Sequence, residues 1–139
     1  MTASFEEKSV WITLSVLLAA FGVYFFLATR MLLAGVMEVV LYVPILALSV
    51  VLLVVLLTIG HAAVAIVNRP DGRDERDRVI EWRAENNSSW VLGVGVIAAI
   101  FGLATSVGTA WIANGLLMAL FVSEVVKHAF QLYYYRRGM

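Results

Sequence analysis

Two histidines, one glutamate and one lysine are the residues of this chain whose types and positions best suit chemistry. His61, Glu124, Lys127 and His128 all lie within long apolar stretches or at their edges. An ionisable side chain inside a membrane-spanning helix is costly and usually faces the protein interior, so it marks a candidate site. We therefore treat these four residues as a candidate buried polar cluster.

Glu124 is the most informative member of this cluster. It lies close to the middle of its apolar stretch, and Lys127 and His128 follow at the spacings of three and four residues at which helical side chains meet. A charged acid at that depth costs on the order of 3 kcal/mol. Glu124 must therefore be neutral, paired or hydrated.

Four interpretations of the cluster are open. It could be a structural network that fixes helix register, because buried charged pairs often only specify packing. It could be a proton or ion pathway, since glutamate and histidine form relays in membranes. His61 and His128 could bind a haem across a bundle core. His61, Glu124 and His128 could instead hold a divalent metal such as zinc. We favour the first interpretation, which needs no cofactor.

Four apolar segments must position these residues. Hydrophobic residues make up 62% of the 139 residues and charged ones 14%, whereas a soluble domain has about half and about a quarter. A span needs about 20 apolar residues, and four segments qualify, at 9–29, 39–67, 89–107 and 110–132. Because lipid offers no partner to backbone groups, the spans must be helices. The sequence predicts an all-α membrane protein, a four-helix bundle forming one integral domain over residues 1–139.

The four spans resemble one helical hairpin written twice. Trp11 opens the first span and Trp90 the third, while His61 and His128 each stand eight residues before an arginine at the ends of the second and fourth. Such a duplication inserts both hairpins the same way up, as in parallel-repeat transporters. It would place the two histidines at one depth on diagonal helices, facing each other.

The third span also carries small residues four apart, at Ala98, Gly102 and Ser106. This pattern lets membrane helices approach closely. It favours packing within the bundle, with a homodimer interface as the alternative.

Basic residues predict the orientation. One side of the membrane has Lys8, the arginines of the connector 68–88, and Arg136 and Arg137, whereas the other side has only Arg30. Because basic residues concentrate on the cytoplasmic side, both termini and the connector should be cytoplasmic.

The connector is the one strongly polar stretch. Pro70-Asp-Gly72 predicts a turn that ends span two, and Asp74 can cap a following helix. Span three could then begin anew at a cap among Asn87, Ser88 and Ser89, or the helix could run straight through. The connector forms a candidate docking surface for a cytoplasmic protein, comprising Asp74, Arg76, Asp77, Arg78 and Glu81.

The segments Asp74-Glu-Arg-Asp-Arg-Val-Ile-Glu81 and Tyr135-Arg-Arg-Gly138 resemble an uncharacterised family of small bacterial four-span membrane proteins with a DERDxxIE loop. The resemblance covers two short motifs. It implies a bacterial inner-membrane protein and brings no activity with it.

The sequence favours a non-enzymatic protein that acts through interactions. Known catalytic motifs are missing, and a net charge of zero gives no reason to expect nucleic-acid binding. The expected partners are membrane lipid, a second copy or a cytoplasmic protein. The alternative is a transport or redox protein that uses His61, Glu124 and His128.

Overall fold

Four long helices dominate the computed structural model, which describes residues 4–69 and 72–138. They are α1 (Phe5–Leu33), α2 (Val43–Val67), α3 (Glu75–Ala104) and α4 (Thr109–Arg137), with a 3-10 turn, η1 (Val39–Tyr42), before α2. Each of the four is long and apolar enough to cross a membrane. The prediction of an all-α four-helix membrane protein is confirmed. Of the predicted turn at Pro70-Asp-Gly72, Pro70 and Asp71 lie outside the described residues.

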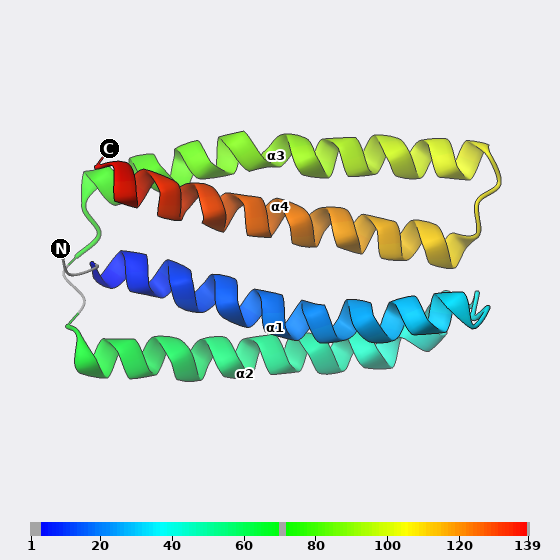
Figure 1. Ribbon diagram of the computed structural model, residues 1–139, viewed down its shortest axis with the longest axis horizontal. Coiled ribbons are helices and arrows are strands. Elements are labelled where there is room, and N and C mark those ends of the chain that lie inside the picture. The colour runs from blue at the N-terminus through cyan, green and yellow to red at the C-terminus, as the bar shows by residue number, and fades with distance from the viewer. Residues whose placement is uncertain (1–3, 70–71, 139) are drawn as a thin grey trace.

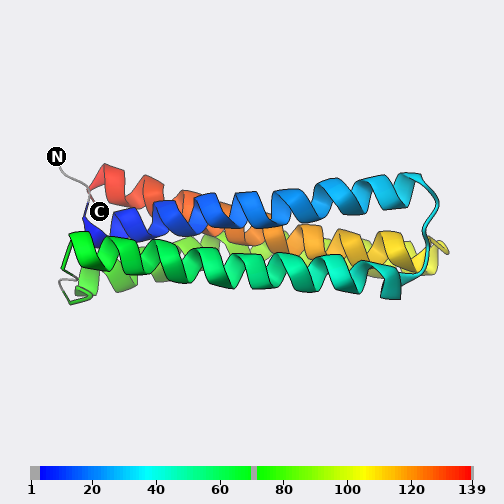
Figure 2. The same ribbon diagram turned by 90° about the horizontal axis from the view of Figure 1, so that it is seen from below.

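The helices lie side by side in the order α3, α4, α1, α2 (Figure 1). Helices α1 and α4 pack against each other in the middle, while α2 packs on α1 and α3 on α4. In Figure 2, α1 and α4 cross at a shallow angle. Both chain ends and the connector lie at one end of the bundle, which we call the terminal end, and the other is the distal end. Both hairpins therefore start at the terminal end.

Helix α3 begins in the polar connector and continues unbroken into the apolar span. Asp74 caps it, since its Oδ1 accepts a hydrogen bond from the Glu75 amide at 2.7 Å and Asp77 bonds back to the Asp74 amide. The Ser88 and Ser89 hydroxyls donate to carbonyls three residues earlier instead of capping a new helix. Of the two alternatives that the sequence left open, the continuous helix is the one observed.

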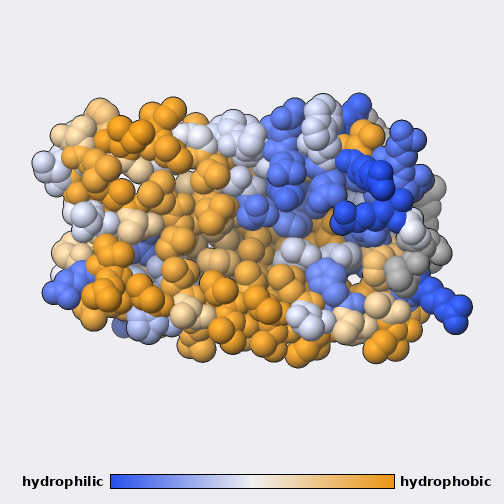
Figure 3. Space-filling model, turned by 180° about the vertical axis from the view of Figure 1, so that it is seen from behind, coloured by the Kyte–Doolittle hydropathy of each residue, from blue (hydrophilic) through white to orange (hydrophobic). Residues whose placement is uncertain are grey.

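Two small clusters form the buried core. At the distal end, Tyr24, Ala28, Leu32, Tyr42 and Ala110 pack together, and at the terminal end Ile80 and Ala84 of α3 pack against Tyr134 of α4. Most other apolar side chains are exposed, and they cover the surface outside the hydrophilic terminal end (Figure 3). Such a surface suits contact with lipid, because hydrocarbon solvates apolar side chains without cost.

Small residues set the closest approach of α3 and α4. A Cβ added at Gly95 would overlap the Cβ of Ala119, and one at Gly102 would lie 3.5 Å from Ile112 Cγ1. Gly95 and Gly102 of α3 therefore pack against α4 within one chain, whereas Ala98 and Ser106, the other members of the predicted small-residue pattern, are exposed.

Candidate functional site

The terminal end contains a polar cavity of about 200 Å³, open on one side, to which all four helices contribute. One arginine, one lysine and two carboxylates line it, so the positive and negative charges of these four side chains balance. Its lining residues are Ser9, Val10, Thr13, His61, Arg73, Asp77, Glu81, Lys127, His128, Gln131 and Tyr135. Both histidines of the chain thus line one cavity, although the Nε2 of His61 is directed at the hydroxyls of α1 and not at His128.

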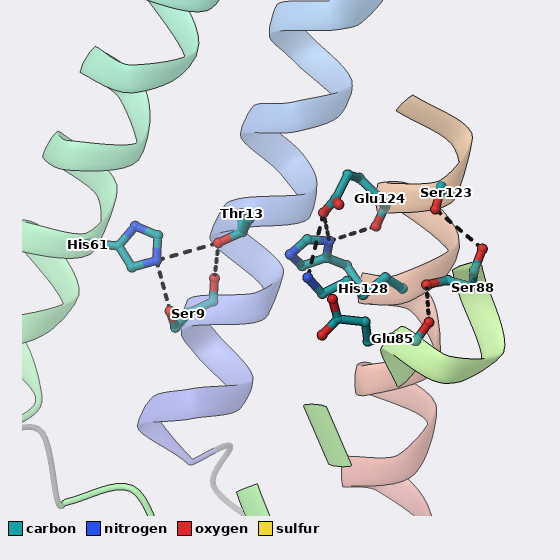
Figure 4. Close-up of polar contacts among 9 residues, drawn as sticks. Ser9, Thr13, His61, Glu85, Ser88, Ser123, Glu124 and His128 are labelled. Atoms are coloured by element: carbon teal, nitrogen blue, oxygen red, sulfur yellow. Dashed lines mark hydrogen bonds and ion pairs between the residues drawn. The ribbon is translucent and has the colours of Figure 1, made fainter. Parts of the chain in front are cut away.

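Helix α1 holds the ring of His61 on α2. The Nδ1 of His61 lies 2.8 Å from the Leu57 carbonyl oxygen, and its Nε2 lies 2.8 Å from Ser9 Oγ and 3.4 Å from Thr13 Oγ1 (Figure 4). We call this arrangement the His61 cradle. Nearer the terminal end, Lys8 donates to the Asn68 side chain at 3.0 Å, so polar contacts fasten α1 to α2 along this stretch.

His128 lies between the cavity and Glu124. Its Nδ1 is 2.7 Å from the backbone oxygen of Glu124 and 4.0 Å from the carboxylate Oε2 of the same residue. Its side chain is 12% exposed and lines the cavity, whereas that of Glu124 is 40% exposed and does not. The Lys127 ammonium lies 3.9 Å from the same carboxylate oxygen. The predicted pairing of Glu124 with Lys127 and His128 is therefore present in the geometry.

The structure redistributes the predicted docking surface. Asp77 and Glu81 line the cavity, where Tyr135 donates to Asp77 at 2.8 Å and the partly exposed Glu81 accepts from Arg73 at 3.4 Å. The remaining residues, Asp74, Arg76 and Arg78, are exposed, and Asp74 serves as the helix cap. Two sets that the sequence treated as separate therefore contribute to one site.

The cavity residues of α1, Ser9, Val10 and Thr13, were not singled out from the sequence. Ser9 and Thr13 stand four apart on α1 and both face His61. Their spacing was a signal, since hydroxyls one turn apart at the start of a span share a helical face. The helix that this face contacts follows only from the packing of α1 on α2.

A haem fits this arrangement poorly. Pockets for drug-sized ligands usually measure about 300–1,000 Å³, larger than the cavity of about 200 Å³. The Nε2 of His61, the atom that would reach iron, is already bonded to Ser9.

A metal centre is not formed either. Within residues 4–69 and 72–138, no three or more histidine, cysteine, aspartate or glutamate side chains are grouped so that they could hold a metal ion. His61, Glu124 and His128 are therefore not brought together as a ligand set.

Aromatic rings fill the α1–α4 interface beyond Glu124, toward the distal end. The Phe121 ring lies 5.7 Å from that of Phe21 and 5.5 Å from that of Phe25, measured between centroids. Farther on, the Tyr24 hydroxyl donates to buried Asn114 at 2.7 Å. The polar groups of the cavity and its surroundings thus extend to Glu124, and beyond it the α1–α4 interface is aromatic apart from the Tyr24–Asn114 pair.

Comparison with known proteins adds no relative: no protein-family model matches the chain, and neither a curated protein nor a solved structure matches it significantly.

Proposed function

We propose that this chain is a proton-responsive membrane protein in which the polar cavity takes up protons from the cytoplasm and passes them through His128 to Glu124. The observation that carries the proposal is the position of His128, whose ring lines the cavity while its Nδ1 approaches the Glu124 carboxylate. Histidine changes charge near neutral pH and can accept a proton at one ring nitrogen and release one at the other. It is therefore suited to pass protons from a wet cavity to a deeper acid.

The energetics of Glu124 support the same conclusion. A carboxylate in the bilayer costs on the order of 3 kcal/mol, and protonation removes that cost. The Lys127 contact, at 3.9 Å and beside a partly exposed carboxylate, is too long for a close ion pair. Proton loading thus changes the charge of a helix whose neighbours are α1 and α3. Because aromatic rings fill the space beyond Glu124, we propose uptake from one side and not flow across the membrane.

The proposed location is a bacterial inner membrane, with both termini and the connector in the cytoplasm. The basic residues at the terminal end support this orientation, and the resemblance of Asp74–Glu81 to the DERDxxIE loop supports the bacterial source. The matching positions of His61 and His128 support an internal repeat. Each Nδ1 bonds to the carbonyl four residues earlier.

Infrared difference spectra of the protein in lipid nanodiscs test the proposal. Acidification should produce the carbonyl bands of protonated carboxylic acids, and subtraction of the Glu124→Gln spectrum should isolate the component that belongs to Glu124, which we call the Glu124 band. Glu38→Gln is the matched control, because Glu38 is an exposed acid at the distal end. The proposal fails if the acid-induced carboxyl bands of the wild type and of Glu124→Gln are the same.

The relay role of His128 predicts a rate effect. In pH-jump experiments, His128→Ala should slow the appearance of the Glu124 band without abolishing its final amplitude, because the acid remains and only the path to it is changed. A rate equal to that of the wild type would remove His128 from the pathway.

A second candidate function is docking of a cytoplasmic protein on the outward face of α3. Trp82 is 65% exposed and Val79 43% exposed, and a hollow of about 630 Å³ adjoins Val79 and Tyr134. Aromatic anchors beside a hollow are typical of protein interfaces.

Affinity capture tests the docking candidate. Replacing Asp74 or Asp77 would disturb the helix cap, so Trp82→Ala and Arg78→Glu are the better variants, with Trp90→Ala as the control for loss of an exposed tryptophan within the span. A specific partner recovered with the wild type should be lost with Trp82→Ala. Equal recovery of the partner with the wild type and with Trp82→Ala would exclude this surface as the docking site.

A further inference from the structure

The His61 cradle is the second place in the cavity where a titratable ring is held by specific partners. His61 Nδ1 faces the Leu57 carbonyl at 2.8 Å, and a carbonyl can only accept, so Nδ1 carries a proton. The other nitrogen, Nε2, faces the two hydroxyls of α1, Ser9 at 2.8 Å and Thr13 at 3.4 Å. Nε2 is therefore the nitrogen that gains a proton when the ring becomes charged and loses it when the ring becomes neutral.

The hydroxyl protons show what each partner can do. Thr13 Oγ1 donates its single proton to the Ser9 carbonyl at 3.0 Å, so toward His61 it can only accept. The Ser9 hydroxyl can rotate and either donate or accept. With a neutral ring, Ser9 donates to Nε2. With a protonated ring, Nε2 donates to Ser9, and Thr13 becomes a second acceptor.

We infer that the His61 cradle is a proton-binding site of its own, built to hold the ring in both protonation states while α1 stays fastened to α2. The inference rests on the proposed function and deepens it, because it assigns a second proton to the same cavity. In the cavity this proton would lie among Asp77 and Glu81 from α3, Arg73 from the connector, and Lys127, His128 and Tyr135 from α4. Helix α1 adds no ionisable group to the cavity lining.

The two histidines thereby take different roles. The Nδ1 of His128 also bonds to a carbonyl, that of Glu124 at 2.7 Å, but the Glu124 carboxylate lies 4.0 Å from the same nitrogen and can receive its proton, whereas His61 has only hydroxyl and carbonyl partners. The residue of the second hairpin that corresponds to Ser9 is Ser88, two residues before its tryptophan. Ser88 donates to the Glu85 carbonyl and not to a histidine. The cradle therefore belongs to the first hairpin, where a proton is held and not passed on.

Nitrogen-15 NMR of labelled histidine in nanodiscs tests this inference, because the chain has only two histidines. His61→Gln assigns the signals. At high pH the His61 ring should carry its proton on Nδ1, and at low pH on both nitrogens. Observation of the Nε2–H form at high pH would overturn the assignment.

Thr13→Val provides the decisive comparison. Since Thr13 can bond only to the protonated ring, its loss should move the His61 titration to lower pH by about half a pH unit, a factor of about three in proton affinity. Thr13→Ser should restore the midpoint. Thr58→Val is the matched control, because Thr58 likewise donates to a carbonyl four residues earlier, at 2.8 Å, but has no histidine partner.

A midpoint in Thr13→Val equal to that of the wild type would overturn the inference. The His61 signal is read separately from the Glu124 carboxyl band. A His61 midpoint that shifts in Thr13→Val, without a Glu124 band in the wild type, would support the cradle and refute the relay. A Glu124 band together with an unshifted His61 midpoint would support the relay and refute the cradle.

Discussion

Tyr24 and Asn114 show how a polar pair is accommodated inside the membrane-spanning part of the bundle. The buried Tyr24 hydroxyl donates to Asn114 Oδ1 at 2.7 Å, and Asn114 Nδ2 donates to the Ala110 carbonyl at 2.9 Å. Helices in lipid gain little from hydrophobic association, so such hydrogen bonds contribute to the choice of neighbours. This pair links α1 to α4, the contact that joins the two hairpins.

The Tyr24–Asn114 bond should be measurable by a double-mutant cycle. Tyr24→Phe and Asn114→Ala each remove it, and their effects on the free energy of unfolding should be coupled by about 0.6–1.7 kcal/mol. Steric-trapping or denaturant measurements in bicelles give the four stabilities. Additive effects of the two substitutions would show that the bond contributes nothing to helix association.

The partners of the site residues were less predictable than the residues themselves. Helical spacing correctly placed Glu124 beside Lys127 and His128, because those contacts lie within one helix. The bond from His61 to Ser9 depends on how α1 is rotated against α2. Both helices are apolar around most of their circumference, so the sequence holds no strong signal for that rotation.

Helix α3 illustrates the same limit for an element. Its start at Asp74 was predictable from local capping chemistry, and the cap is present. The sequence did not predict whether the helix would break among Asn87, Ser88 and Ser89. The structure contains it as one helix because Ile80, Ala84 and Ser88 are buried along its length, and Ser123 of α4 donates to the Ser88 carbonyl at 3.3 Å. Tertiary contacts thus outweigh a local capping signal.

Two glycines of α3 give a matched test of its packing on α4. A side chain at Gly95 would overlap Ala119, whereas a Cβ at Gly93 meets nothing within 4 Å. Gly95→Val should therefore force α3 away from α4 and lower the unfolding temperature, with a cost of about 1–3 kcal/mol. Gly93→Val changes the helix propensity by the same amount but creates no overlap, so this variant should unfold near the wild-type temperature. Equal effects would mean that this close approach is absent.

At the scale of the whole molecule, the four helices were predictable and much of their arrangement was not. Length and hydropathy identify membrane spans because the bilayer imposes a fixed thickness. The side-by-side order α3, α4, α1, α2 (Figure 1) is set by particular contacts, such as Gly60 of α2 against Ile12 of α1. In lipid, apolar patterning does not distinguish a packed face from an exposed one.

The proposed orientation belongs to the molecule as a whole, because it decides which solution supplies the polar cavity with protons. The chain has no cysteine, so single-cysteine variants can be labelled without background. Arg78 and Glu38 are both exposed and lie on the connector side and the distal side, respectively. In intact bacterial cells, an impermeant maleimide should label Glu38→Cys at once and Arg78→Cys only after permeabilisation. The positive-inside distribution is the physical reason, since only Arg30 is basic on the distal side. The reverse labelling pattern would place the cavity on the outer side, and the proposed proton source would then be the external solution and not the cytoplasm.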